Sequence, residues 1–160
     1  MRILLVSDTH RHNDNYLRVL KRVGMIDMVI HCGDSEGSEY ILSEAAPCPF
    51  YIVTGNNDFF SNLPREEEIS VAGHKILVTH GHTYGVHRGY DMLVEAAKAG
   101  GYDVVMFGHI HMPVIEEKDG VLVLNPGSLT YPRQYGRRPS YIIIDVDEES
   151  GRMEPHLEYL

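Results

Sequence analysis

Five short segments of the sequence combine carboxylate, amide and imidazole side chains, and each follows directly after an apolar run. The segments are 7–10, 33–34, 55–58, 80–82 and 108–111. Carboxylate and amide oxygens beside imidazole nitrogens suit Mn²⁺, Fe²⁺, Zn²⁺ or Ni²⁺ better than Ca²⁺. Such a site needs no thiolate, and we assign Cys32, which lies inside an apolar run, to the core. The pattern therefore predicts a metal centre built at strand ends.

The spacing within these segments suggests how they would share the metal. In an extended backbone, residues i and i+2 point the same way, so we expect Asp8 and His10 to converge on one ion. Asp34 is the candidate bridge, because two dications about 3.5–4 Å apart repel each other and a shared carboxylate can hold them together. Alone, an Asp-x-His or a Gly-Asp pair is an ordinary turn. The whole set, in this order, favours a metal site.

The apolar runs are the strands that must bring these segments to one rim. In the first third of the chain we expect strands over 2–6, 28–32 and 50–54, a helix from Asn13 or Asp14 to Gly24, and a short helix over 38–45. This βαβαβ order predicts a parallel sheet. In such a sheet, ligands collect beyond the carboxyl ends of the strands.

The rest of the chain mixes hairpins with single strands. We expect a hairpin of 68–72 and 75–79, a helix over 88–99, a strand over 103–107, a hairpin of 114–115 and 121–124, and strands over 141–146 and 153–157. The mixture indicates an α/β (α+β) fold with two packed mixed sheets and helices outside. A chain of 160 residues predicts a single domain over 1–160.

Composition limits the partners of the protein. A formal net charge of −9 disfavours a sequence-independent grip on nucleic-acid phosphates. No apolar run approaches the roughly 20 residues of a membrane-spanning helix. Cys32 and Cys48 form no CxxC pair, which favours a reduced, cytoplasmic protein. Arg133, Arg137 and Arg138 are either a solvated surface or a basic loop that reaches an anionic substrate.

Taken together, the segments resemble the signature of the calcineurin-like metallophosphoesterases. The resemblance rests on Asp8-x-His10, Gly33-Asp34, Gly55-Asn56-Asn57-Asp58, Thr79-His80-Gly81-His82 and Gly108-His109-Ile110-His111, and it covers residues 7 to about 128. Asn125-Pro126-Gly127-Ser128 and the small size resemble the YfcE-type phosphodiesterase branch. The resemblance implies a four-layer αββα sandwich with a two-metal site.

The resemblance also implies the ligands of each metal. One ion would be held by Asp8, His10, Asp34 and His111, and the other by Asp34, Asn56, His80 and His109. His80 is preferred over His82 because it matches the family's ligand histidine before a glycine. His82 would then face substrate or support the ligands. The expected cofactor is a pair of divalent ions, with Mn²⁺ preferred and Ni²⁺, Fe²⁺ or Zn²⁺ as alternatives.

The implied reaction is hydrolysis of a small phosphate ester, above all a phosphodiester, by a metal-held hydroxide that attacks phosphorus in line. Asn57, His82 and Asp58 are the candidate catalytic residues. Many family members have a histidine at the position of Asn57, where it is thought to protonate the leaving group. An amide cannot act as a general acid, although it can hydrogen-bond a phosphoryl oxygen. Asp58 and Ser128 are also open to simple turn and cap roles.

Two other functional classes are weighed against the enzyme. A non-catalytic protein-binding scaffold, similar to the related retromer subunit, could lose ligands without harm, whereas this chain has the whole set. A metal-storage protein would spread its ligands through tracts, and here they stand singly at strand ends. A homo-dimer or homo-tetramer is compatible with the sequence. The remaining histidines are assigned to ordinary surface or core positions: His12, His31, His74, His87 and His156.

Overall fold

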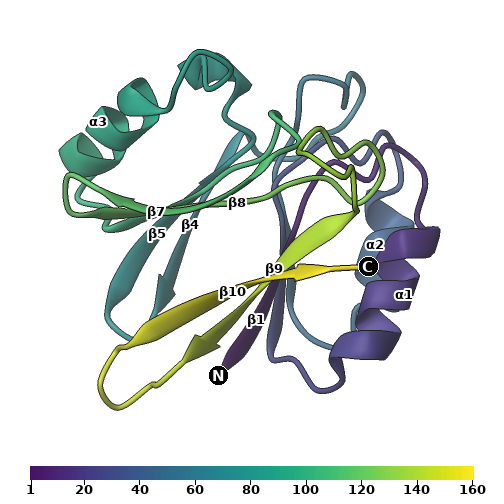
Figure 1. Cartoon of the computed structure of the whole chain (residues 1–160), viewed down its shortest axis with the longest axis horizontal. Coiled ribbons are helices and arrows are strands. Elements are labelled where there is room, and N and C mark those ends of the chain that lie inside the picture. The colour runs from purple at the N-terminus through teal and green to yellow at the C-terminus, as the bar shows by residue number, and fades with distance from the viewer.

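The computed structural model describes residues 1–160, which form two five-stranded sheets packed face to face (Figure 1). The first sheet has the order β10-β9-β1-β2-β3. Its strands are β1 (Arg2–Val6), β2 (Met28–His31), β3 (Phe50–Ile52), β9 (Ser140–Val146) and β10 (Met153–Tyr159). β1, β2 and β3 run parallel, and β9 is antiparallel to both β1 and β10.

The second sheet has the order β4-β5-β6-β8-β7. Its strands are β4 (Glu66–Val71), β5 (His74–Thr79), β6 (Val104–Met106), β7 (Pro113–Lys118) and β8 (Val121–Pro126). The central strands β5, β6 and β8 are parallel, and the edge strands β4 and β7 pair antiparallel with their neighbours. Both sheets are therefore mixed, as the sequence predicted.

The helices cover the outer faces of the sheets. Figure 1 shows α1 (Asp14–Val23) and α2 (Glu39–Ala45) on one flank and α3 (Asp91–Gly100) on the opposite flank. Tyr16 of α1 and Leu42 of α2 pack against the first sheet, and Leu93 of α3 packs against the second. The predicted αββα layering is confirmed. No helix is long and apolar enough to cross a membrane.

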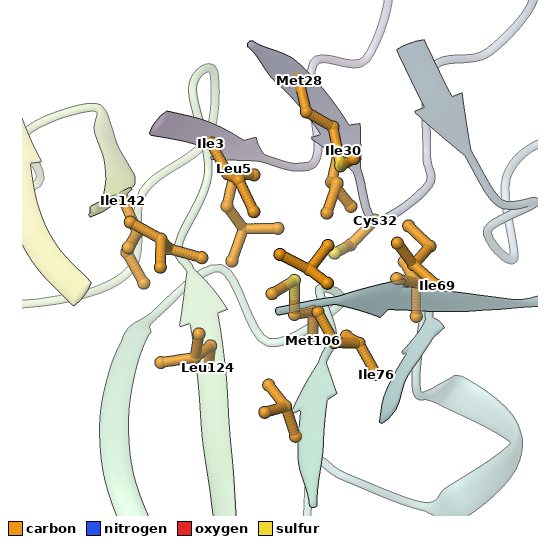
Figure 2. Packing of buried hydrophobic residues seen from close by; sticks show 14 of the residues in the cluster. Ile3, Leu5, Met28, Ile30, Cys32, Ile69, Ile76, Met106, Leu124 and Ile142 are labelled. Atoms are coloured by element: carbon orange, nitrogen blue, oxygen red, sulfur yellow. The ribbon is translucent and has the colours of Figure 1, made fainter. Parts of the chain in front are cut away.

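Alternation along each strand divides the core into layers. In β1, Ile3 and Leu5 belong to the cluster between the sheets, whereas Leu4 and Val6 belong to the cluster under α1 and α2. A strand covered on both faces must be apolar at consecutive positions, which explains the unbroken apolar run. Figure 2 shows the cluster between the sheets, in which Cys32 is fully buried, as predicted.

The start of the third helix was predicted three residues too early, because the helix begins at Asp91 and not at residue 88. The preceding segment forms a short 3-10 helix, η1 (His82–Tyr84), followed by turns. Gly85 and Gly89 have φ values of 64° and 128°, which an α-helix cannot contain. The other predicted elements lie within a few residues of the observed ones.

Candidate metal centre

The five predicted segments meet where β1, β2, β3, β5 and β6 end. Within the first sheet, the N–H of Asp8 donates to the carbonyl of Gly33 at 3.1 Å. Between the sheets, the N–H of His109 donates to Oδ2 of Asp8 at 3.1 Å, and Nδ1 of His80 donates to the carbonyl of Cys32 at 2.7 Å. The structure therefore brings these segments from both sheets to one rim.

The backbone at this rim is unusual, because five of the predicted ligands adopt a left-handed conformation. Their φ values are 55° for Asp8, 45° for His10, 59° for Asp34, 68° for His109 and 58° for His111. A non-glycine residue pays about 1–3 kcal/mol for a sparsely populated conformation, so the surrounding contacts must impose it. The extended backbone invoked for Asp8 and His10 was wrong. Their side chains meet because the chain coils, not because it is straight.

Two glycines allow the segments to approach one another. A Cβ on Gly55 would lie 2.1 Å from Oδ1 of Asp34, and a Cβ on Gly108 would lie 2.1 Å from Oγ of Ser7 and 2.9 Å from Oδ2 of Asp8. Any larger residue at either position would displace a carboxylate of the site. These glycines keep the candidate ligands packed against backbone.

One group of metal-binding atoms comes from Asp8, His10 and His111, whose ligand atoms all lie within 4.8 Å of one another. Nε2 of His10 lies 3.3 Å from Nε2 of His111 and 3.8 Å from Oδ2 of Asp34. This is the set expected around the first ion, and all four residues are buried.

A second group comes from Asp8, Asp34 and His80, whose ligand atoms also lie within 4.8 Å of one another. Nε2 of His80 is 3.0 Å from Oδ1 of Asn56 and 3.5 Å from Oδ2 of Asp34. The ring of His109 lies 5.1 Å from the ring of His80, centroid to centroid. Asp8 belongs to both groups, and Asp34, a member of the second, lies 3.8 Å from Nε2 of His10 in the first, so both carboxylates lie between the two groups.

Hydrogen bonds fix which nitrogen of each buried histidine is free. His10, His80 and His111 all donate their Nδ1–H to an oxygen. The acceptors are Glu36 Oε1 at 2.6 Å, the Cys32 carbonyl at 2.7 Å and the Tyr131 carbonyl at 2.8 Å, respectively. In a neutral imidazole the other nitrogen then carries a lone pair. This arrangement is typical of metal-binding histidines, whose second nitrogen is held by an outer acceptor.

The free Nε2 lone pairs of these three histidines face atoms that also carry lone pairs, and not hydrogen-bond donors. Nε2 of His111 lies 3.0 Å from Oδ1 of Asp8, and that oxygen is buried and accepts no hydrogen bond. Close atoms that all carry negative charge or lone pairs repel one another unless a cation or a proton stands between them. The residues present therefore fit a divalent cation.

The pKa values of the cluster point the same way. Burial disfavours the charged carboxylate of Asp8, but the nearby His111 and His80 outweigh it and lower the pKa. Burial opposes protonation of His111, and its contact with Asp8 outweighs this effect and raises the pKa. Burial and the neighbouring His80 lower the pKa of His109 to about 4. The contact between Asp8 and His111 therefore favours positive charge beside the carboxylate.

Comparison with known proteins identifies the family. A model described as the calcineurin-like phosphoesterase superfamily domain matches residues 1–149. The chain belongs to this superfamily. It is 35% identical to the probable metallophosphoesterase YsnB of Bacillus subtilis over 154 residues, which cover 94% of this chain and 88% of YsnB. It is 34% identical to phosphodiesterase MJ0936 of Methanocaldococcus jannaschii over 145 residues, which cover 79% and 83%.

Other similarities bear on the branch and on the fold. Phosphodiesterase YfcE of Escherichia coli is 28% identical over 81 residues, 51% of this chain and 40% of YfcE. A predicted phosphoesterase from Streptococcus pneumoniae superposes with a TM-score of 0.80 at 26% identity, covering 98% of this chain and 97% of that one. A Vps29 from Entamoeba histolytica superposes with a TM-score of 0.79 at 23% identity, covering 100% and 99%. The last likeness shows the fold alone.

Glu36 supports a candidate ligand histidine and was not predicted from the sequence. Its carboxylate accepts the Nδ1–H of His10, and its own backbone is left-handed, with a φ of 55°. Nε of Arg11 donates to the Glu36 carbonyl at 2.7 Å. A signal was available, because Glu36 stands two residues after Asp34, the same spacing as in Asp8-x-His10.

The Asp58 carboxylate is buried and accepts hydrogen bonds from groups of the protein. Its Oδ2 accepts the N–H groups of Asp34 at 2.9 Å and Gly55 at 2.7 Å. Its Oδ1 accepts the N–H of Glu36 at 2.6 Å and the hydroxyl of Ser35 at 3.3 Å. Asp58 therefore ties the segment after β2 to the segment after β3.

Asn57 and His82 lie beside the candidate ligands. The N–H and the side-chain NH₂ of Asn57 donate to the two carboxylate oxygens of Asp34 at 2.8 and 2.6 Å. The ring of His82 lies 5.4 Å from that of His80, and its buried Nδ1 has no hydrogen-bond partner. Burial and then the neighbouring His80 lower the pKa of His82.

Ser128 connects the loop after β8 to the site. Its hydroxyl donates to the Asp8 carbonyl at 2.8 Å and accepts the N–H groups of Thr130 and Tyr131.

The remaining histidines lie outside the two ligand groups. His31 is buried and bonds Thr9 and Gly33, His12 bonds Tyr131, His74 bonds Asp103 and Gly151, His156 lies 3.7 Å from Asp145, and His87 is exposed with its ring 6.4 Å from that of His109.

Proposed function

We propose that this protein hydrolyses small phosphodiesters at a two-metal centre. The observation that carries the proposal is the set of buried Nε2 lone pairs on His10, His80 and His111, which face carboxylate and amide oxygens at 3.0 to 3.8 Å. The superfamily and the phosphodiesterase names of two relatives support the ester class.

Each ion would have its own donor set around a shared carboxylate. One would be held by Asp8, His10, Asp34 and His111, and the other by Asp34, Asn56, His80 and His109. Mn²⁺ is the proposed ion, because Mg²⁺ tolerates imidazole ligands poorly. When bound, such a pair supplies Lewis acidity, which lowers the pKa of water and neutralises charge that develops on phosphoryl oxygens.

The protein's own residues orient the shared carboxylate and limit the chemistry. Asn57 holds both oxygens of Asp34, so its NH₂ group is already engaged. No side chain at this position can protonate a leaving group, and general-acid help is typically worth about 10²–10⁴-fold. We therefore expect aryl diesters, which have good leaving groups, to react faster than simple alkyl monoesters.

Hydrolysis of bis(p-nitrophenyl) phosphate by metal-stripped protein tests the proposal. We expect no turnover in chelator, and more activity with Mn²⁺ or Ni²⁺ than with Mg²⁺. Asp34→Asn should abolish turnover and leave the protein folded, whereas the exposed His156→Ala should keep the rate within about threefold. Full activity in chelator would contradict the proposal.

A binding scaffold is the second candidate, because its fold would be the same. The fold likeness to Vps29 is compatible with both functions. The complete donor set favours the enzyme, since binding a protein partner requires no buried lone pairs. A metal-loaded protein that hydrolyses no phosphate ester in a panel of mono- and diesters would favour the scaffold.

A further inference from the structure

A hollow of about 430 Å³ opens beside the candidate metal centre, on the side of Asn56. Its lining residues include Asn56, Phe59, Arg65, His82 and Thr83. Ligand sites commonly measure about 300–1,000 Å³ and combine an apolar wall with a few polar groups. A group attached to phosphorus at the metals would therefore have this hollow next to it.

Arg65 gives the hollow a positive charge that no protein group uses. Its guanidinium makes no ion pair and no hydrogen bond in the structure, although three glutamates follow Arg65 directly in the sequence. Glu66 instead accepts the hydroxyl of Tyr84, and Glu68 accepts the hydroxyl of Tyr102. An unpaired guanidinium at a binding hollow is suited to a carboxylate or phosphate.

Arg65 lines the same hollow as His82 and Asn56, so its charge lies on the side of the candidate metal centre. The chain carries 23 acidic and 14 basic residues, so an unpaired cation here is not explained by a general excess of basic residues.

Phe59 gives the hollow an apolar wall. Its side chain is 77% exposed and belongs to none of the three core clusters. The neighbouring Asp58 is anchored by four hydrogen bonds, which fix where the Phe59 backbone stands. A phenyl ring left in water forgoes the free energy of burial, and stacking with a planar ring would recover part of it.

We propose that this hollow binds one ester group of the diester, and that this group carries a planar ring and a second negative charge, as a nucleoside monophosphate does. The inference rests on the proposed function, because the scissile phosphorus must sit at the metals. In the reaction, water oxygen bonds to phosphorus and one phosphorus–oxygen ester bond breaks. One proton of the water goes to the departing oxygen, and the products are an alcohol and a phosphomonoester.

A binding experiment on the metal-free protein tests the hollow without catalysis. The probes are AMP, adenosine and ribose 5-phosphate, titrated by calorimetry in chelator. We expect AMP to bind at least tenfold more tightly than either fragment. Arg65→Gln should remove the tighter binding of AMP relative to adenosine. Phe59→Ala should remove the tighter binding of AMP relative to ribose 5-phosphate. Arg152→Gln, an exposed arginine paired with Glu154, is the matched control and should change nothing.

A kinetic experiment then separates this inference from the proposed function. The substrates are pApA, ApA, which lacks the terminal phosphate, and bis(p-nitrophenyl) phosphate. Arg65→Gln should lower kcat/KM for pApA by 10- to 100-fold and leave the other two within threefold. Hydrolysis of the aryl diester with no effect of Arg65→Gln on pApA would overturn the inference and leave the proposed function standing. If no diester is hydrolysed, the proposed function fails, and AMP binding no tighter than adenosine overturns the inference by itself.

Discussion

Replacing Asp58 by asparagine tests whether this residue holds the site together from inside. The side chain is only 6% exposed, and the amide has the size of the carboxylate. The carboxylate accepts two N–H groups on Oδ2, at 2.9 and 2.7 Å, and one N–H and one hydroxyl on Oδ1. Whichever way the amide is turned, its NH₂ faces at least one backbone N–H group.

The expected loss of stability follows from this contact between two hydrogen-bond donors. A hydrogen bond to a charged group contributes about 1.5–3 kcal/mol, and at least one is replaced by two donors in contact. We therefore expect Asp58→Asn to lower the free energy of unfolding by about 2–4 kcal/mol. Urea denaturation of the metal-free protein at neutral pH measures this change. Asp119→Asn, in an exposed hairpin turn with a φ of 52°, is the control and should be neutral, because asparagine tolerates that conformation. A loss below about 0.5 kcal/mol for Asp58→Asn would refute the reasoning.

Three further predictions concern other parts of the site. Glu36→Gln should weaken Mn²⁺ binding by about 10- to 100-fold, measured by calorimetry, because it removes the charged acceptor of a ligand histidine, whereas Glu39→Gln should not. Gly108→Ala should displace the Asp8 carboxylate and lower metal affinity at least as much, which a metal titration would detect. Burial lowers the pKa of His31 to about 4, so the unfolded chain gains a proton near pH 6.5 that the folded chain refuses until about pH 4. The free energy of unfolding should therefore fall as the pH drops through this window, by up to about 3 kcal/mol from this residue. When urea denaturation is repeated at several pH values, the free energy of unfolding of His31→Gln should depend less on pH than that of the wild type.

The positions of the site segments could be predicted because they depend on sheet topology. Asp8, Asp34 and His80 each follow an apolar strand, and parallel strands carry their carboxyl ends to one edge. The helix that covers the second sheet was harder to delimit, because Gly85 and Gly89 only mark turns once their positive φ values are known.

The contacts that hold the ligands could not be predicted from spacing. The side chain of Asp58 turns inward because it accepts N–H groups of Asp34, Gly55 and Glu36, and the side chain of Asn57 turns to Asp34 because it donates to that carboxylate. The role of Glu36 depends on a contact with His10, 26 residues away in the chain. Such contacts exist only after the ends of β1, β2 and β3 have come together.

The central claim is that two metal ions bind between these strand ends and are needed for hydrolysis. The most direct measurement is a titration of metal-stripped protein with Mn²⁺ that follows bound metal and bis(p-nitrophenyl) phosphate hydrolysis in the same samples. Activity should reach its plateau at two Mn²⁺ per chain, and Asp34→Asn should stay inactive at every Mn²⁺ concentration. Saturation below one Mn²⁺ per chain, or full hydrolysis before any Mn²⁺ is added, would contradict it.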